Sequence, residues 1–156
     1  SSADRIHLTL HFLGDVETSK KDELVETIRP VVAAHDPLAL AVEGVGAFPD
    51  IERPTVLWAG VKGTGQPGLM RLQQELGRVL AGHGFEVEPR FTPHLTLGRV
   101  RKPLYREASR ALNEWYYGRW QFAKFGEFTV DAIHLMRSQL GAGGPRYTSL
   151  ATFDLQ

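Results

Sequence analysis

The sequence predicts one α+β domain with mainly antiparallel sheets. The chain has 156 residues, which is enough for one sizeable core and too few for two ordinary domains. Helical and strand patterns alternate over its first two thirds, and three strand patterns follow one another near the end. No linker or low-complexity stretch divides residues 1–156, so we expect a single domain.

The first strand pattern covers Ile6–Leu13. Side chains of residues i and i+2 share one face of a strand, so His7, Thr9 and His11 are expected on the same side, opposite the intervening leucines. We interpret His11 as a solvated or hydrogen-bonded strand histidine.

The first helix is predicted to begin at Ser19, which would act as its N-cap with the acid Asp22 three residues later. Apolar residues at helical spacing continue to Val32, and Pro30 is expected to kink or shorten the helix. Leu38–Phe48 then alternates apolar with small or polar residues, which indicates a half-buried strand.

The middle of the chain predicts a strand, a helix and a second strand. Thr55–Val61 is the first strand, and the apolar spacing of Leu69–Leu80 predicts an amphipathic helix. The glycine pair Gly82 and Gly84 is expected to end that helix. His94–Val100 has the composition of the next strand.

The last part of the chain predicts a third helix over Leu104–Trp115 and three strands. The strands are expected at Gln121–Val130, Asp131–Ser138 and Arg146–Phe153. The glycine-rich turn Gly141–Gly144 predicts a hairpin between the last two.

The composition excludes several classes of site. There is no cysteine, so a disulfide framework, a thiolate zinc site and a cysteine nucleophile are excluded, and we expect a cytoplasmic protein. Lys+Arg and Asp+Glu number 18 each, so any affinity for a polyanion must come from a local patch such as Arg99–Arg110. No apolar run approaches the roughly eighteen residues that a membrane span needs.

One tetrapeptide occurs twice: His7–Leu10 and His94–Leu97 both read His-Leu-Thr-Leu. A shuffled chain of this composition would contain about 0.006 copies, so the repetition indicates function. In a strand, each copy would present one imidazole and one hydroxyl on the same face. Two copies on neighbouring strands would place two histidines and two threonines around a shared site.

That set of side chains suits a phosphate diester. A neutral histidine can take a proton from water, a protonated one can protonate the leaving oxygen, and threonines can bind the non-bridging oxygens. Imidazole suits both roles because its ordinary pKa, about 6.5, lies near working pH. Two histidines with no Cys, Asp or Glu at ligand spacing form a poor metal site, so we expect neither metal nor cofactor. Two half-buried strands that merely carry histidine remain the structural alternative.

These residues resemble the two-histidine phosphoesterase superfamily, and within it the bacterial and archaeal branch called 2′-5′ RNA ligase or RNA 2′,3′-cyclic phosphodiesterase. The segments that carry the resemblance span most of the chain: Ile6–Glu17, Gly44–Ile51, Pro54–Lys62, Phe91–Arg101 and Phe125–Leu150. The resemblance implies a bilobal α+β fold with pseudo-twofold symmetry and a cleft between the lobes. Relatives usually begin with a further strand and helix, which we expect this chain to lack.

The resemblance also implies the roles of individual residues. His7 matches the proton donor to the leaving 3′ oxygen, and His94 matches the base that activates water. Thr9 and Thr96 match the phosphate ligands, and Arg99 matches a basic position near the phosphate. Phe91 is a further candidate, for stacking on a base.

The implied reaction is metal-independent hydrolysis of RNA 2′,3′-cyclic phosphate ends to 2′-phosphates, with 2′-5′ ligation without ATP as its chemical reverse. The expected partner is tRNA-like or other short RNA, and we expect a monomer that does not bind membranes. Two alternatives remain open: a module that binds a nucleotide or RNA end without turnover, and a phosphodiesterase of a small cyclic nucleotide.

Trp58 is interpreted as a packing residue.

Overall fold

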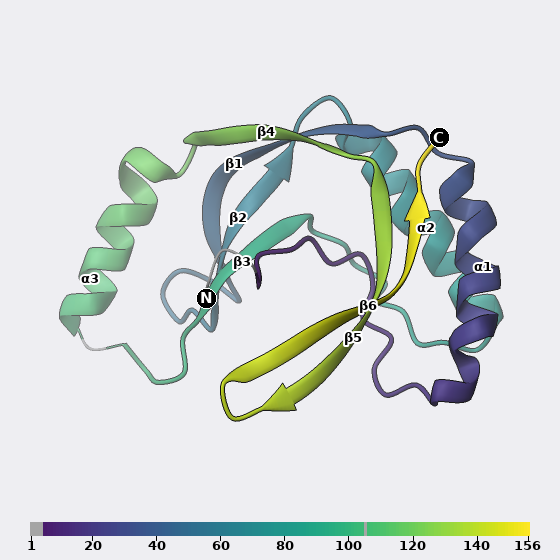
Figure 1. The fold of residues 1–156 in the computed structure, drawn as a ribbon. Coiled ribbons are helices and arrows are strands. Elements are labelled where there is room, and N and C mark those ends of the chain that lie inside the picture. The colour runs from purple at the N-terminus through teal and green to yellow at the C-terminus, as the bar shows by residue number, and fades with distance from the viewer. Residues whose placement is uncertain (1–4, 105) are drawn as a thin grey trace. The chain divides into compact units, whose positions relative to one another are not determined.

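The computed structural model describes residues 5–104 and 106–156 and has an α+β architecture (Figure 1). Its elements are, in chain order, η2 (Thr18–Lys20), α1 (Lys21–Ala33), β1 (Leu38–Phe48), β2 (Val56–Lys62), α2 (Gln66–Gly82), β3 (His94–Arg99), α3 (Arg106–Trp115), η3 (Tyr116–Trp120), β4 (Lys124–Val130), β5 (Ala132–Gly141) and β6 (Gly144–Asp154). Three α-helices and two sheets thus confirm the predicted fold class.

The chain forms two compact units. The first unit consists of residues 1–10, 39–66 and 91–128, and the second of residues 11–38, 67–90 and 129–156. Each unit is assembled from three separate stretches of sequence, so each depends on contacts between residues far apart in the chain. The units are described separately below.

The first unit contains most of a four-stranded sheet in the order β3-β2-β1-β4. Strands β1 and β2 pair antiparallel, with Gly46 opposite Trp58 and Phe48 opposite Val56. Strands β2 and β3 also pair antiparallel, with Trp58 opposite Thr96. Because directly opposed residues point to the same face, these pairs define one face of the sheet.

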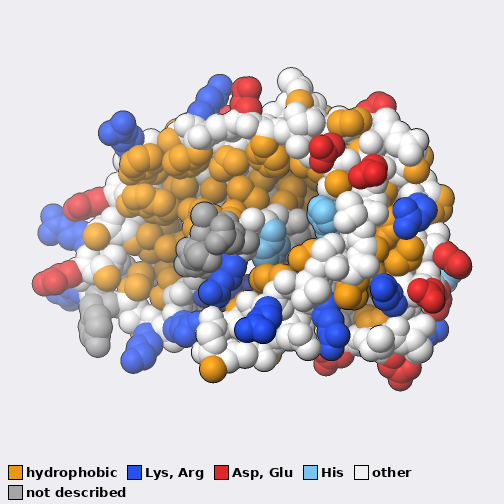
Figure 2. Space-filling view, viewed as in Figure 1, with side chains coloured by type: hydrophobic (Ala, Val, Ile, Leu, Met, Phe, Trp, Pro, Cys, Tyr) orange, Lys and Arg blue, Asp and Glu red, His pale blue; other side chains and the backbone are white. Residues whose placement is uncertain are grey.

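The other face of this sheet borders an apolar hollow of about 360 Å³. Alternate residues of the central strands line it, together with aromatic side chains that follow in the chain: Ile6, Val42, Val45, Ala59, Leu95, Leu97, Trp115, Trp120 and Phe125. Figure 2 shows hydrophobic side chains gathered over the region of β1, β4 and α3. The leucines of the repeated tetrapeptide in β3, Leu95 and Leu97, thus face this hollow.

The second unit contains α1, α2 and the β5–β6 hairpin. Its buried side chains are mostly those predicted from helical spacing, followed by two from the C-terminal strand region: Leu24, Ile28, Val32, Leu69, Leu72, Leu76, Leu80, Phe153 and Leu155. The hairpin closes through the pair Gly141 and Gly144, and Gly144 has a φ of +100° that favours glycine. The predicted hairpin turn is confirmed.

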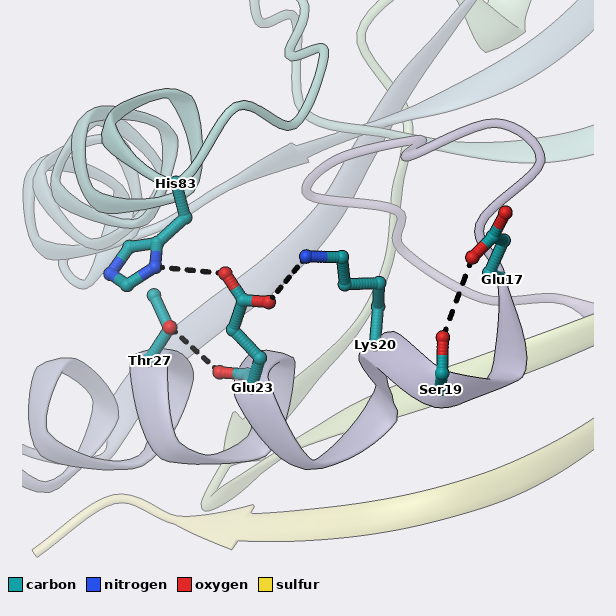
Figure 3. A network of polar contacts seen from close by, with 6 residues as sticks. All are labelled: Glu17, Ser19, Lys20, Glu23, Thr27 and His83. Atoms are coloured by element: carbon teal, nitrogen blue, oxygen red, sulfur yellow. Dashed lines mark hydrogen bonds and ion pairs between the residues drawn. The ribbon is translucent and has the colours of Figure 1, made fainter.

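Histidines hold the elements of the second unit together. His35 is buried, and its Nε2 lies 2.7 Å from a carboxylate oxygen of Glu75, which joins the end of α1 to α2. His83 lies 3.2 Å from Glu23, whose other oxygen accepts a 3.0 Å hydrogen bond from Lys20 (Figure 3). These contacts give His35 and His83 a structural role.

His11 is also structural. Its Nε2 donates a 2.8 Å hydrogen bond to the carbonyl of Gln73 in α2, and Gly77 leaves room for the ring because a Cβ there would lie 3.0 Å from His11 Cε1. Of the two interpretations, a solvated or a hydrogen-bonded strand histidine, the contact with Gln73 supports the second, but His11 does not lie in a strand.

Two local predictions are wrong. Ile6–Leu13 does not form a strand: Leu8 makes one isolated bridge, and from His11 onward the chain belongs to the second unit, where that residue bonds to α2. Ser19 does not cap α1, because it lies in the 3₁₀ turn η2 and its hydroxyl is 3.4 Å from Glu17. Acidic residues in the first turn of α1 provide the favourable charge at its N-terminus instead.

The remaining elements agree with the sequence. Strand β1 has the predicted bounds, α2 ends at Gly82 as predicted, and α1 passes through Pro30 before it ends at Ala33. The predicted third helix begins at Arg106, while Tyr105 lies outside the described residues. No helix in the described part of the chain is long and apolar enough to cross a membrane.

Candidate active site

The two copies of the repeated tetrapeptide lie side by side in the first unit. Leu8 of the first copy forms an antiparallel bridge with Leu95 of the second, although 87 residues separate them in sequence. The first copy has no further ladder, whereas the second begins strand β3. The two copies are therefore neighbours, although only the second lies in a strand.

The antiparallel bridge determines which side chains face one another. Around a Leu8–Leu95 pair, His7 comes opposite Thr96 and Thr9 opposite His94, because paired residue numbers keep a constant sum. The leucine face borders the apolar hollow, which Leu95 lines. His94 and Thr96 therefore lie on the opposite face of β3, and we expect His7 and Thr9, which lie outside any strand, to share that face.

Both motif histidines are held by the backbone in the same way. His7 Nδ1 lies 2.7 Å from the carbonyl of Arg5, and His94 Nδ1 lies 2.6 Å from the carbonyl of Thr92. A carbonyl oxygen can only accept, so each Nδ1 must carry a proton and donate it. The proton that comes and goes is then the one on Nε2, which makes Nε2 the nitrogen available for acid–base chemistry in both residues.

The two histidines differ in their surroundings. His7 is exposed, whereas His94 is half-buried and meets aromatic rings on the same face of the sheet. Its ring centroid is 5.0 Å from that of Phe48, edge to face, and 6.4 Å from that of Trp58. The rings of Phe48 and Trp58 are themselves 5.3 Å apart.

Arg99 reaches the histidine face through a β-bulge. Leu57 pairs with Gly98 but Trp58 pairs with Thr96, so Leu97 is an extra residue in β3. In a regular strand Arg99 would face the same way as Leu97, toward the hollow. The bulge reverses this, because Arg99 now pairs with Val56, which lies two residues from Trp58 on the histidine face.

The other predicted site residues have fewer described contacts than His94. Phe91 is half-buried in the irregular segment that precedes β3, and Thr9 and Thr96 are both half-buried. Within residues 5–104 and 106–156, no three His, Cys, Asp or Glu side chains are grouped so that they could hold a metal ion. On β3, His94, Thr96 and Arg99 share one face of the sheet, and the Leu8–Leu95 bridge brings the segment that carries His7 and Thr9 beside this strand.

A family model described as the 2′-5′ RNA ligase superfamily matches residues 2–142 of the chain. The chain belongs to this superfamily. An RNA 2′,3′-cyclic phosphodiesterase of Aquifex aeolicus is 33% identical over 152 residues, covering 96% of this chain and 78% of the relative. A protein of the same name from Methanothermobacter thermautotrophicus is 32% identical over 152 residues, covering 97% and 79%.

Solved structures of the superfamily share the fold. TT0787 of Thermus thermophilus superimposes with a TM-score of 0.77 at 27% identity, covering 97% of this chain and 78% of that one. LigT of E. coli complexed with 3′-AMP gives a TM-score of 0.74 at 25% identity, covering 99% and 79%. The resemblance stated from the repeated motif is thereby confirmed at the level of family and fold. The cleft between two lobes and its pseudo-twofold symmetry stay predictions.

Sequence reasoning missed the contact of Phe48 and Trp58 with His94. Trp58 was assigned to packing, yet its ring lies beside a motif histidine. One available signal was the alternation of side chains along a strand: in the predicted strand Thr55–Val61, Trp58 faces away from Leu57 and Ala59. Without the register between β2 and β3, this alternation alone does not show that Trp58 and His94 share a face.

Proposed function

We propose that this protein hydrolyses RNA 2′,3′-cyclic phosphate ends to 2′-phosphate ends, by acid–base catalysis with His7 and His94 and without a metal ion. The observation that carries the proposal is the Leu8–Leu95 bridge, which brings both His-Leu-Thr-Leu copies side by side in one compact unit. The names of the relatives support the substrate class, because they are RNA 2′,3′-cyclic phosphodiesterases.

In the proposed reaction His94 acts as the base and His7 as the acid. His94 Nε2 takes a proton from water as the water oxygen bonds to phosphorus. The bond between phosphorus and the 3′ oxygen breaks, and His7 Nε2 gives its proton to that oxygen. The products are a 2′-phosphate and a free 3′-hydroxyl, and proton exchange with solvent restores both histidines. The carbonyl contacts of Nδ1 support this use of Nε2.

The polar neighbours have roles in charge stabilisation. In the proposed reaction Thr9 and Thr96 donate hydrogen bonds to the non-bridging phosphate oxygens, where negative charge increases as the fifth bond to phosphorus forms. Arg99 adds a positive charge on the same face, which supports its assignment to phosphate binding. Phe91 remains a candidate for stacking on the terminal base.

Ligation uses the same residues with a different nucleophile. If the 5′-hydroxyl of a second RNA replaces water, His94 takes its proton and the product is a 2′-5′ phosphodiester. This step needs no ATP because the strained cyclic phosphate is already activated. We propose ligation as a secondary activity of a monomeric, cytoplasmic enzyme on tRNA-like or other short RNA ends.

The test is an assay with a short RNA that ends in a 2′,3′-cyclic phosphate, in the presence of EDTA. We expect a product heavier by one water that carries a 2′-phosphate, identified by mass and by sensitivity to phosphatase. The product should form with a bell-shaped pH dependence and should be absent with His94→Ala. A 3′-phosphate product, or full activity of the variant, would overturn the assignment.

The same assay separates the alternatives. Stoichiometric retention of the RNA end with no product would favour a binding module. Turnover of a small cyclic nucleotide with no turnover of the RNA would favour a different phosphodiesterase that uses the same histidine pair.

A further inference from the structure

We infer that Trp58 is a positioning residue for His94: together with Phe48 it holds the imidazole so that Nε2 faces the substrate. The inference rests on the proposed function, because it concerns the base of that reaction. Trp58 touches no reacting atom and acts through the His94 ring.

The aromatic contacts come from three neighbouring strands. Phe48 lies on β1, Trp58 on β2 and His94 on β3, and β2 separates the other two strands. The rings of Phe48 and His94 nevertheless approach to 5.0 Å between centroids. Their side chains must therefore lean over β2, where Trp58 is within 6.4 Å of both rings. His94 is thus bordered by two aromatic rings from two other strands.

The position of the indole is itself determined by a glycine. A Cβ added to Gly46, which lies opposite Trp58 on β1, would be 2.2 Å from the indole carbon Cζ2. The indole therefore lies directly against the backbone of β1, and any side chain at residue 46 would displace it. A ring packed against the main chain has little freedom to move.

The rings complement the hydrogen bond made by His94 Nδ1. That bond to the carbonyl of Thr92 holds one edge of the imidazole, but a single hydrogen bond still permits the ring to tilt about it. Contacts with Phe48 and Trp58 restrict the tilt. The direction of Nε2 then follows from a backbone carbonyl on one side and aromatic rings on the other, which is the kind of preorganisation that proton transfer requires.

One detail makes Trp58 a good residue to test. Within the described residues its buried Nε1 has no hydrogen-bond partner. Replacement by phenylalanine therefore removes no hydrogen bond and retains an aromatic ring, whereas replacement by leucine removes the ring. The two variants separate the aromatic contact from every polar effect.

The kinetic experiment compares Trp58→Leu, Trp58→Phe and the control Trp115→Leu on a cyclic-phosphate dinucleotide. We expect Trp58→Leu to lower kcat about tenfold with KM little changed, and Trp58→Phe to recover most of kcat. Trp115 lines the apolar hollow on the other face of the sheet, so Trp115→Leu should lower the melting temperature without this specific loss of kcat.

Double variants test whether Trp58 acts through His94. In single turnovers with excess enzyme, Trp58→Leu should still lower the residual rate of His7→Ala but should leave that of His94→Ala unchanged. Equal losses in both backgrounds, or unchanged kcat in Trp58→Leu, would overturn the inference and leave Trp58 as a packing residue.

An NMR measurement keeps the inference testable even if the proposed reaction fails. The ring protons of His94 should be shifted by the ring currents of Phe48 and Trp58, and Trp58→Leu should move them strongly while Trp115→Leu leaves them in place. His94 signals that do not respond to Trp58→Leu would refute positioning independently of turnover. Responsive signals in an inactive protein would refute the proposed function alone.

Discussion

The six histidines of this chain divide into two sets that are held in different ways. The two motif histidines lie in the first unit, and each bonds through Nδ1 to the carbonyl two residues before it. The other four lie in the second unit and bond to partners between 15 and 62 residues away: His11, His35, His83 and His134.

The long-range kind of bond links two separate segments of the chain to each other. The local kind orients the imidazole ring so that its Nε2 is directed away from the backbone carbonyl. A long-range bond such as that between His35 and Glu75 ties two helices together, so its loss should weaken the fold. A local bond such as that of His94 joins no distant elements and mainly orients the ring. Residue type alone therefore does not distinguish the two sets, but the sequence separation of the bonded partner does.

The largest effect should come from the motif histidines. We expect His7→Ala or His94→Ala to lower kcat/KM by about two to four orders of magnitude, because each variant removes one proton transfer. The free energy of unfolding should fall less in His94→Ala than in a variant that loses a bond between two helices, because the Nδ1 bond of His94 is local and only its ring contacts with Phe48 and Trp58 reach other strands. His134→Ala is the matched control: it removes an exposed strand histidine with hydroxyl neighbours, and activity should be unaffected. A large loss of stability in His94→Ala would break the distinction between the two sets.

For His35→Ala we expect a loss of stability with no loss of activity. The variant removes a buried hydrogen bond to Glu75, and we expect the free energy of unfolding to fall by about 2 kcal/mol in urea denaturation. The kcat of the folded variant should match that of the parent. If His35→Ala lost activity while retaining its stability, the assignment of this set to structure would be wrong.

A smaller effect should come from the threonines of the motif face. Thr9→Val and Thr96→Val retain the shape of the side chain and remove the hydroxyl. We expect each to reduce kcat about tenfold, because one hydrogen bond to the phosphate charge is lost. Steady-state kinetics of both variants check this, and Thr152→Val, next to His134, is the control. Unequal losses would show that one copy of the motif carries most of the phosphate contact.

The smallest effect concerns the pH dependence of stability. Hydrogen bonds from Lys20, and then from His83, lower the pKa of Glu23 below its usual 4.5 (Figure 3). A carboxylate with a lowered folded pKa stabilises the protein above its unfolded pKa, and this contribution is lost as pH falls through the folded value. Unfolding curves between about pH 5 and pH 3 should therefore be less pH-dependent for Glu23→Gln than for the parent. Identical slopes would show that this exposed network has no effect.

Much of the fold follows from the spacing of apolar residues. The alternation of Leu38–Phe48 and the helical spacing up to Gly82 predicted β1 and α2 well, because both elements bury one face. The first strand was predicted wrongly because the segment depends on contacts with distant residues, Leu8 with Leu95 and His11 with Gln73. The start of α1 was predicted wrongly for a local reason. Ser19 resembles a cap in sequence, but the preceding 3₁₀ turn moves the first helical turn past it.

The candidate site could be predicted only in part. The repeated tetrapeptide and the alternation of strand residues predicted that His94 and Thr96 share a face, and the pairing of β3 with β2 confirms this. That His7 and Thr9 share the same face stays a prediction, because their segment is not a strand. The orientation of the two histidines could not be predicted, because their Nδ1 partners are main-chain carbonyls and the side chains of Arg5 and Thr92 do not provide them. The role inferred for Trp58 depends on the register between strands, which one sequence does not reveal.

The bulge at Leu97 has a consequence for how this site should be recognised in other sequences. Thr96 and Arg99 are an odd number of residues apart, so strict alternation would assign them to opposite sides of the strand. The extra residue Leu97 shifts the alternation by one position. A sequence search that requires strict alternation would therefore not assign Arg99 to the site. Deleting Leu97 would remove the bulge and place Arg99 two residues after Thr96, so regular alternation would then keep both residues on the same side of β3.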